Sequence, residues 1–460
     1  SQTAPCALQT ALASAGDGDT LYLAGGTYTG SGGAVITLTA NLTLTGGWDG
    51  SSAVPPVVNP GAYPSRINGE SLRRGVFVGN TITATLEGLT IMSGTHTSKG
   101  AGIYARDARL TLRAMEIISN VIDVYDIPNT YAYGSGAMVE GGALVVEDST
   151  FRANSAWARK QTFGGGLAIS NTLAATVTGS LFHKNDAWQA SGLYFRGHPA
   201  AYLPFTLTEC TFTRNGRGES VGRASGGYSG AVAVVWAIAH LEANTMSDNH
   251  ASNDYGALSI MASQGLLTRN TLTGNTCART AGLYLYNVTP MTIANNIIAG
   301  NSALYDWLHD NSAVQVRGGE SRFLHNTIAR NAFAYGIKVN EGATAALTNT
   351  ILLSHTVGIS VTAGSTASLE GTLWGSGAWA NTADWGGAGA IITGATNIWG
   401  DPAFVNPGAA DYHIGAGSAA LDAGVHAGVN AAITTDVDGD PRPAGRSEEH
   451  TSELQSQNAI

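Results

Sequence analysis

One short stretch of this sequence carries the residue types that proton transfer requires. Asp306, His309 and Asp310 fall within five residues, with Trp307 between them. An imidazole beside carboxylates can accept and donate protons, and an indole face nearby can hold a sugar ring. If the protein catalyses a reaction, we expect Asp306, His309 and Asp310 to be its catalytic groups.

A larger set of aromatic and basic residues lies in insertions between regular segments of the chain. Aromatic faces with polar neighbours suit sugar rings, and binding residues often lie on loops of a rigid scaffold. The alternative is that these rings fold back and cover the flank of the protein, since they would otherwise form an exposed apolar patch. The expected ligand-binding residues are Tyr125, Tyr133, Trp157, Arg159, Trp188, Arg217, Tyr228, Tyr255, Tyr305 and Trp307.

Motifs of several other chemistries are missing from the sequence. There is no Asn-Thr-Asp, paired Asp-Asp or Gly-His-Gly, the motifs of polygalacturonase-like hydrolases. No three acids recur at repeat spacing to hold Ca²⁺, and Cys6, Cys210 and Cys277 form no Cys-x-x-Cys motif. The sequence therefore predicts no metal site and no cofactor, with Ca²⁺ left open but indicated by no specific motif.

A repeated asparagine shows which elements must position these residues. The repeat ends in apolar-x-x-Asn, and its copies are 26 to 34 residues apart. A second asparagine lies five residues earlier in the later copies. The first series is Asn120, Asn154, Asn185, Asn215, Asn249, Asn275, Asn301 and Asn331, and the second is Asn244, Asn270, Asn296, Asn326 and Asn349.

Apolar residues alternate within each copy, as in Leu144 and Val146 or Leu283 and Leu285. This is the period of a strand with one buried face, and short strands repeating at this interval predict a solenoid of stacked coils. Asparagine suits its corners because it tolerates a left-handed backbone and can hydrogen-bond along a stack of its own kind. Cys210 stands where later copies have the early asparagine, so we expect it to face inward.

The phrases GGALVVEDSTFRANS (141–155) and YGALSIMASQGLLTRNTLTGNT (255–276) resemble the repeats of polymorphic outer-membrane proteins. They resemble more generally the right-handed parallel β-helix proteins of bacterial surfaces. The resemblance implies an all-β, pectin-lyase-like fold: a single right-handed parallel β-helix solenoid with a short N-terminal capping helix around Leu8 and Leu12. Residues 397–424 and 436–443 are similar to the closing segment of choice-of-anchor proteins.

The expected organisation has four parts. Residues 1–30 form the cap and first strand, 31–375 the β-helix coils, and 376–445 the terminal coils with a truncated C-terminal segment. Residues 446–460, RSEEHTSELQSQNAI, resemble a translated sequencing adapter. We therefore expect this tail to be non-native and the natural C-terminus to be lost.

Composition excludes several classes of protein. Charged residues are 12% and hydrophobic residues 43% of the 460 residues, so the chain can bury a core and is not disordered. The 23 Lys and Arg against 33 Asp and Glu exclude a basic nucleic-acid binder. No apolar run approaches the roughly 18 residues of a membrane-spanning helix.

These observations favour an exported bacterial cell-surface protein that is adhesin-like or binds glycans through the loop edge of the solenoid. The expected partner is a polysaccharide or a host or cell-surface glycan, bound by a monomer. A polysaccharide lyase or glycoside hydrolase with a non-standard site and a structural envelope protein are the alternatives. Carboxylates clustered at the loop edge would favour the enzyme. An aromatic strip without such carboxylates would favour glycan binding, and a flank without a groove would favour the structural role.

Overall fold

The computed structural model describes residues 6–216, 230–304, 311–425 and 433–441. The chain divides into two compact units, Ser1–Ala233 and Val234–Ile460. The adapter-like residues 446–460 lie outside the described ranges, as do Arg217, Tyr228, Tyr305 and Trp307 and the predicted catalytic Asp306, His309 and Asp310.

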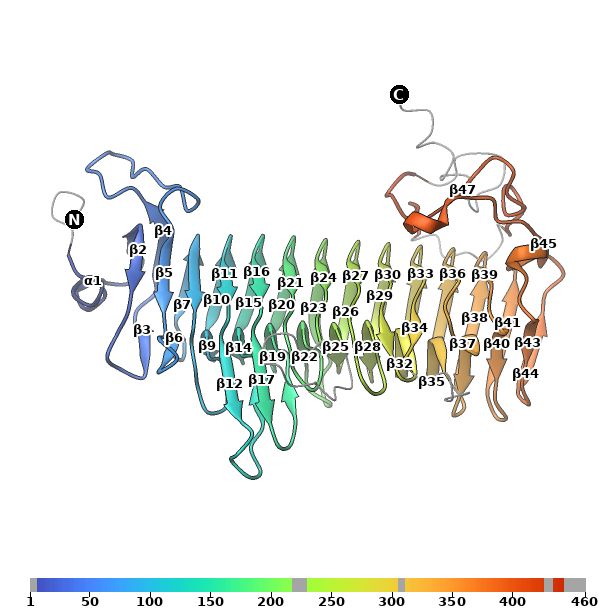
Figure 1. Cartoon of the computed structure of the whole chain (residues 1–460), viewed down its shortest axis with the longest axis horizontal. Coiled ribbons are helices and arrows are strands. Elements are labelled where there is room, and N and C mark those ends of the chain that lie inside the picture. Colours follow the sequence, from blue (N-terminus) through green and yellow to red (C-terminus); the bar gives the residue numbers. More distant parts are fainter. Residues whose placement is uncertain (1–5, 217–229, 305–310, 426–432, 442–460) are drawn as a thin grey trace. The chain divides into compact units, whose positions relative to one another are not determined.

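Unit 1 begins with the predicted short helix, α1 (Leu8–Ser14), and continues as coils of three strands each (Figure 1). We call the three stacks of strands PB1, PB2 and PB3, in the order in which a coil passes through them. In unit 1, PB1 contains β3 (Ala34–Leu38), β6 (Arg74–Val78), β9 (Ile103–Arg106), β14 (Ala137–Glu140), β19 (Leu167–Ser170) and β22 (Leu193–Arg196). PB2 contains β1 (Thr20–Ala24), β4 (Leu42–Trp48), β7 (Thr83–Glu87), β10 (Arg109–Arg113), β15 (Ala143–Glu147), β20 (Ala174–Thr178) and β23 (Leu203–Thr208). PB3 contains β2 (Gly26–Tyr28), β5 (Ser65–Asn68), β8 (Leu89–Met92), β11 (Glu116–Ile118), β16 (Thr150–Arg152), β21 (Leu181–His183) and β24 (Thr211–Thr213).

Unit 2 repeats this arrangement, after β25 (Val232–Val235) has crossed the boundary between the units. Its PB1 and PB2 strands are β26 (Ala237–Glu242), β28 (Leu258–Met261), β29 (Gln264–Thr268), β32 (Thr280–Ala294), β35 (Ser312–Leu324), β37 (Tyr335–Asn340), β38 (Thr344–Thr348), β40 (Val357–Val361), β41 (Thr366–Glu370), β43 (Ala383–Gly386) and β44 (Ala390–Thr393). Its PB3 strands are β27 (Thr245–Ser247), β30 (Thr271–Thr273), β33 (Ile297–Ala299), β36 (Thr327–Ala329), β39 (Ile351–Leu353), β42 (Leu373–Gly375) and β45 (Ile398–Gly400).

Each strand pairs in parallel with the equivalent strand of the next coil, so that equivalent side chains form columns. In β10, for example, Leu110 and Leu112 pair with Leu144 and Val146 of β15. The inward columns are buried aliphatic and phenylalanine side chains, such as Phe151, whose ring stacks 4.7 Å from the ring of the next coil's phenylalanine. The predicted stacking of coils around one apolar interior is confirmed within each unit.

The asparagines form hydrogen-bonded ladders, as the sequence predicts. The first series lies at the corner after PB3, and Asn244, Asn270, Asn296 and Asn326 form a second ladder at the corner between PB2 and PB3. Asn154 donates from Nδ2 to Ile117 O (2.8 Å) and to Asn185 Oδ1 (3.0 Å). Its own Oδ1 accepts from the backbone N and from Nδ2 of Asn120, at 3.1 and 2.9 Å. Cys210 is buried as expected, and its sulfur accepts the backbone N–H of Ser180 at 3.4 Å.

Two parts of the asparagine prediction are wrong. The left-handed backbone falls on the residue before the ladder asparagine, for example Ser119 and Ala153, because the bend must come before the side chain can turn inward. Asn349 has a positive φ itself and does not belong to the second ladder, where Thr350 takes the equivalent place. Asn349 instead exchanges two hydrogen bonds with the backbone of Val425.

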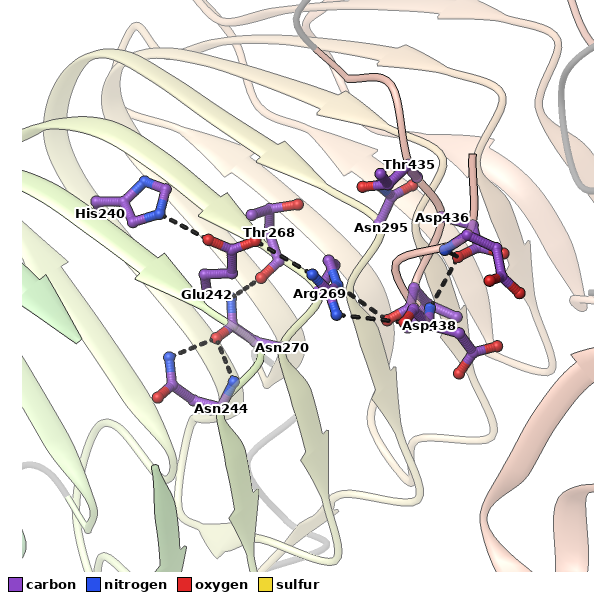
Figure 2. Close-up of polar contacts among 12 residues, drawn as sticks. His240, Glu242, Asn244, Thr268, Arg269, Asn270, Asn295, Thr435, Asp436 and Asp438 are labelled. Carbon is purple, nitrogen blue, oxygen red and sulfur yellow. Dashed lines mark hydrogen bonds and ion pairs between the residues drawn. The ribbon is translucent and has the colours of Figure 1, made fainter. Parts of the chain in front are cut away.

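The C-terminal segment of unit 2 folds back along the same unit. It contains η2 (Pro407–Ala409) and the antiparallel pair β46 (Phe404–Asn406) and β47 (Asp411–Ile414), whereas η1 (Gly377–Trp379) lies within a coil, between β42 and β43. Arg269 donates to the carbonyls of Val437 and Asp438 at 3.3 Å, and Asn295 Nδ2 donates to Thr435 O at 2.7 Å (Figure 2). These side chains hold the end of the described chain against successive turns between PB2 and PB3.

Candidate functional site

The outward face of PB1 in unit 1 carries a column of large side chains. Strand alternation turns Val76 and Val78 of β6 inward and Phe77 outward. Phe77 pairs in register with Thr37 of β3 on one side and Tyr104 of β9 on the other. The same column continues through Met138, Ala168 and Tyr194.

Loops between PB3 and PB1 project beside this column and stack on one another. The loop strands β12 (Val121–Val124) and β17 (Ser155–Ala158) pair in parallel, as do β13 (Ala132–Tyr133) and β18 (Thr162–Phe163). The insertions therefore lie on one edge of unit 1, as the sequence predicts. Because successive loops are hydrogen-bonded, they form a continuous wall.

Part of the PB1 face is closed by this wall. The Phe163 ring lies 4.9 Å from the ring of Tyr133 and 4.8 Å from that of Tyr194. Beneath these rings Met138 and Ala168 are each only 1% exposed. The aromatic residues here cover the scaffold, which is the alternative that the sequence left open.

The face opens toward the N-terminal end of the column. A cavity of about 560 Å³ lies there, over β3 and β6 and beside the loop 93–100. Its lining is Gly33, Ala34, Thr37, Leu72, Arg73, Arg74, Phe77, Thr95, His96, Thr97 and Asp123. The lining combines an aromatic ring, hydroxyls, cations, an imidazole and one carboxylate, which together could bind a polar ring with many hydroxyls.

Arg74 forms one wall of the cavity. Its Nε donates to Gly100 O at 2.7 Å and its Nη2 to Lys99 O at 2.8 Å. The guanidinium carbon lies 5.0 Å from the ring centroid of Tyr104 and 5.8 Å from that of Phe77. Burial lowers the pKa of Arg74 to about 10, so the group remains charged at neutral pH.

His96 is neutral at neutral pH. Its Nδ1 faces the backbone N–H groups of Ser98 and Lys99, at 3.2 and 3.4 Å, and accepts hydrogen bonds from them. Burial, and then the positive charge of Arg74, lower the pKa of His96 to about 4. The proton of the neutral ring is therefore assigned to Nε2, because Nδ1 acts as the acceptor.

Tyr104 lies beside Phe77 and contacts a half-buried ion pair that includes Glu140 of the next PB1 strand. Its hydroxyl donates to Glu140 Oε2 at 2.8 Å, and Lys99 Nζ donates to both oxygens of that carboxylate at 2.9 and 2.7 Å. Burial and the hydrogen bond with Glu140 raise the pKa of Tyr104 to about 12. Burial opposes ionisation of Glu140, but its bonds from Lys99 and Tyr104 outweigh burial and hold its pKa below the usual range.

Two predicted ligand-binding residues of unit 1 meet each other but lie apart from the cavity lining. Arg159 Nε donates to Tyr125 O at 3.0 Å, and its guanidinium carbon lies 5.9 Å from the Tyr125 ring centroid. Tyr125 is 47% exposed. Neither side chain lines the cavity.

The other described predictions lie in wall or flank positions. Trp157 and Trp188 are half-buried in the wall, and Trp157 pairs in register with Asp123, which does line the cavity. Tyr255, in unit 2, stacks on Tyr284 with the ring centroids 3.6 Å apart. Tyr284 is only 2% exposed, so Tyr255 covers the PB1 flank of that unit.

Sequence reasoning missed Arg74, Phe77, His96 and Tyr104. Arg74 and Phe77 lie on β6 and Tyr104 on β9, whereas His96 lies in the loop 93–100. This loop stacks beside the loop 120–136 through the bridges Thr95 to Val121 and Lys99 to Tyr133. It was not recognised as an insertion because its corner residue is Gly94, whose N–H donates to Asn120 Oδ1, instead of an asparagine. The sequence signal that could have revealed this loop is its position one repeat length before Asn120, the first asparagine of the ladder.

The three cysteines and the acidic residues add no further chemistry to the described ranges. No disulfide bond joins Cys6, which is exposed, to Cys210 or Cys277, which are buried. Among the residues that the structure describes, no group of three or more His, Cys, Asp or Glu side chains could hold a metal ion. None of the described helices is long and apolar enough to cross a membrane.

Comparison with known proteins identifies the repeat. Residues 191–373 match the family model described as "Right handed beta helix region". No curated protein matches the sequence.

Several solved structures resemble the chain at low identity. The periplasmic alginate epimerase AlgG is 11% identical, with 71% of this chain and 77% of that chain covered and a TM-score of 0.44. Tailspike protein 3 of bacteriophage CBA120 is 12% identical, with 85% and 57% covered and a TM-score of 0.44. The A-module of the Azotobacter vinelandii mannuronan C-5 epimerase AlgE6 is 14% identical, with 85% and 93% covered and a TM-score of 0.37. Together with the parallel pairing of its strands, the family match identifies the fold of this chain as an all-β, right-handed parallel β-helix.

Proposed function

We propose that this protein binds glycans through the cavity over β3 and β6 of unit 1. The observation that carries the proposal is the composition of that cavity, in which one aromatic ring faces threonine hydroxyls, His96 and Asp123 within about 560 Å³. Cavities of roughly 300–1,000 Å³ with a few placed polar groups are typical of small-molecule sites. This volume suits one or two sugar rings of a longer chain.

The chemistry of the lining favours binding over cleavage. The one carboxylate that lines the cavity is that of Asp123, whereas hydrolysis of a glycosidic bond ordinarily uses a pair of carboxyl groups. The described residues also provide no group of acids that could hold Ca²⁺. The outward PB1 column carries the aromatic residues Phe77, Tyr104 and Tyr194, and the described residues place one carboxylate in the cavity. An aromatic strip without clustered carboxylates supports a binding protein.

We further propose that the protein is exported and acts at a bacterial cell surface in an adhesin-like role. The support is the resemblance of its repeats to those of bacterial surface β-helix proteins, and the position of the cavity on an outer face of the coils.

The test is a glycan array combined with an assay for release of reducing sugars. We expect retention of a subset of glycans without release of sugar. Phe77→Ala should weaken binding about tenfold or more, since aromatic contacts commonly contribute 1–3 kcal/mol to recognition. Tyr125→Ala is the matched control, because Tyr125 is an exposed loop aromatic that does not line the cavity.

The variants separate the two candidate surfaces. Loss of binding with Tyr125→Ala and normal binding with Phe77→Ala would move the site to the outer loops. Release of reducing sugar by the unaltered protein would replace binding by catalysis.

A further inference from the structure

Arg74 is a buried cation of the cavity wall that has no anionic partner among the described residues. The residue is 8% exposed, and its guanidinium donates hydrogen bonds to two neutral backbone carbonyls. No carboxylate of the described residues lies within 4 Å of it as an ion-pair partner. A buried cation without an anion is costly, and such charges are ordinarily paired.

The other charged groups around the cavity do not supply that anion. Arg73 is paired with Glu70, and Lys99 with Glu140. Asp123 lines the cavity but forms no ion pair with Arg74, and its Oδ1 accepts the backbone N–H of Tyr125 at 3.3 Å. His96 is neutral at neutral pH, so the cavity has one unpaired positive charge on its wall.

We propose that the ligand is a carboxylated sugar, a ring that bears a carboxylate, and that Arg74 binds this carboxylate. The inference rests on the proposed function and names the class of glycan that the site takes. A guanidinium with an anion forms charge-assisted hydrogen bonds of about twice the strength of neutral ones. The carboxylate would give Arg74 the partner that the protein itself does not provide.

The remaining lining fits the rest of such a ring. Asp123 can accept hydrogen bonds from sugar hydroxyls, and Thr37, Thr95 and Thr97 can donate or accept. The Nε2–H of His96 is a further donor. Phe77 offers a ring against which the C–H face of a sugar can pack.

The experiment measures affinity of the full chain for matched oligosaccharides. An oligouronate is compared with the same oligosaccharide after reduction of its carboxyl groups to alcohols, which keeps the ring and removes the charge. A glycan ending in a sialic acid tests the other common source of a sugar carboxylate, and a sulfated neutral glycan tests binding of any anion. We expect at least one carboxylated ligand to bind about tenfold or more tightly than its uncharged counterpart or the sulfated glycan.

Variants then assign the preference to one residue. Arg74→Gln keeps an N–H donor at the level of Nε, which faces Gly100, and removes the charge, so the ratio of the two affinities should fall to about one. Arg74→Lys should retain part of the preference. Arg109→Gln, an exposed arginine of β10 outside the cavity, should leave the ratio unchanged.

The possible outcomes are distinguishable. Equal affinity of the unaltered protein for the carboxylated and reduced ligands overturns the inference and leaves the proposed function intact, whereas absence of all glycan binding overturns both. A preference unaffected by Arg74→Gln overturns the assignment to Arg74. If Arg74→Gln does not fold, as judged by circular dichroism, salt dependence decides: affinity for the carboxylated ligand should fall steeply with ionic strength, and equal slopes for both ligands would contradict the inference.

Discussion

The ladder asparagines each satisfy backbone groups of neighbouring coils with one buried amide. Asn154 is 0% exposed, and its two side-chain atoms serve Asn120, Ile117 and Asn185. Alanine would leave a backbone N–H and a backbone carbonyl buried without these partners. Each unsatisfied group costs about 1–3 kcal/mol.

We therefore expect Asn154→Ala to destabilise the protein by about 2–4 kcal/mol. The measurement is the shift of the urea unfolding midpoint. Asn80→Ala is the control, because Asn80 is exposed and its side-chain Oδ1 accepts a hydrogen bond from Arg106 Nε at 2.8 Å, so its loss should cost within about 0.5 kcal/mol. Equal shifts for both variants would contradict a structural role for the ladder.

A second residue-scale prediction concerns the acidity of Tyr104. The Glu140 carboxylate accepts the Tyr104 hydroxyl and opposes formation of a second negative charge, which together with burial raises the pKa of Tyr104 to about 12. Glu140→Gln removes that negative charge, so the pKa of Tyr104 should fall toward the ordinary value of about 10. Ultraviolet titration of Glu140→Gln, with Tyr104→Phe in the same background to assign the signal, measures the shift. An unchanged or higher pKa would show that burial alone is responsible.

Residue types alone revealed the ladders but not the cavity. An asparagine recurring at one interval is visible in one sequence because it has the same function in every coil. Arg74 and His96 belong to no repeated motif. Arg74 is distinguished by having no ion-pair partner among the described residues, and His96 by the tautomer that two backbone N–H groups set. Such properties depend on how far neighbouring coils approach, which no spacing along the chain records.

At the scale of elements, the PB3 strands differ along the chain in how many of their residues are buried, and β27 and β30 of unit 2 still bury only the central one. In unit 1, β16, β21 and β24 bury only their central residue, a phenylalanine. In unit 2, β33, β36 and β39 bury all three of theirs. The outward side chains of Ile297, Ile351 and Leu353 pack with Tyr412 and Ile414 of the C-terminal segment, so this face is covered by chain that follows the coils.

This packing predicts that Tyr412 is a major contact of the C-terminal segment. Tyr412 is 4% exposed, and its ring lies 5.1 Å from that of Phe404. Tyr412→Ala should destabilise the protein by about 3 kcal/mol and expose apolar surface that binds a hydrophobic dye. Tyr63→Ala, at a tyrosine that is 41% exposed, is the control and should have little effect on either measurement. Dye binding no greater than that of the control would mean that the segment does not depend on this side chain.

The element-scale pattern was partly readable from the sequence. Strict alternation in β10 and β15 predicts one buried face, and the structure agrees. The runs Ile297-Ile298-Ala299 and Ile351-Leu352-Leu353 break this alternation and indicate strands that are covered on both faces. What covers it could not be predicted, because the covering residues lie far along the chain and have no repeat of their own.

At the scale of the whole molecule, each coil contacts chiefly the coils before and after it. Such a solenoid is stabilised by the sum of its coils and of the interfaces between them, and unfolding can begin where a coil has a neighbour on one side only. In unit 1 the N-terminal coil is adjacent to the short helix α1, whose residues are nowhere fully buried. The interior coils are joined by the phenylalanine stack through Phe151, Phe182 and Phe212.

We therefore expect native-state hydrogen exchange in unit 1 to be graded along the chain. The amides of β16 and β21 should be the most protected, and those of β1 and β2 should exchange fastest. Mass spectrometry of peptides from labelled protein measures the gradient. One uniform rate for all these strands would indicate that unit 1 opens as a single cooperative block.

The attachment of the C-terminal segment also limits how the number of repeats can change. Removing residues 271–296 would remove one whole repeat and leave both asparagine series in phase, so the ladders alone would tolerate the loss. The C-terminal segment would not tolerate it. Val425 is hydrogen-bonded to Asn349, Thr435 to Asn295 and Val437 to Arg269, and these three anchors lie on different coils. Losing a coil would shorten the distance between the outer anchors by about 4.8 Å and put His325 where Asn295 now binds. The anchored segment thus fixes the number of coils between Arg269 and Asn349. Related proteins that gain or lose a coil there should carry a compensating change in the length of the segment between residues 425 and 437.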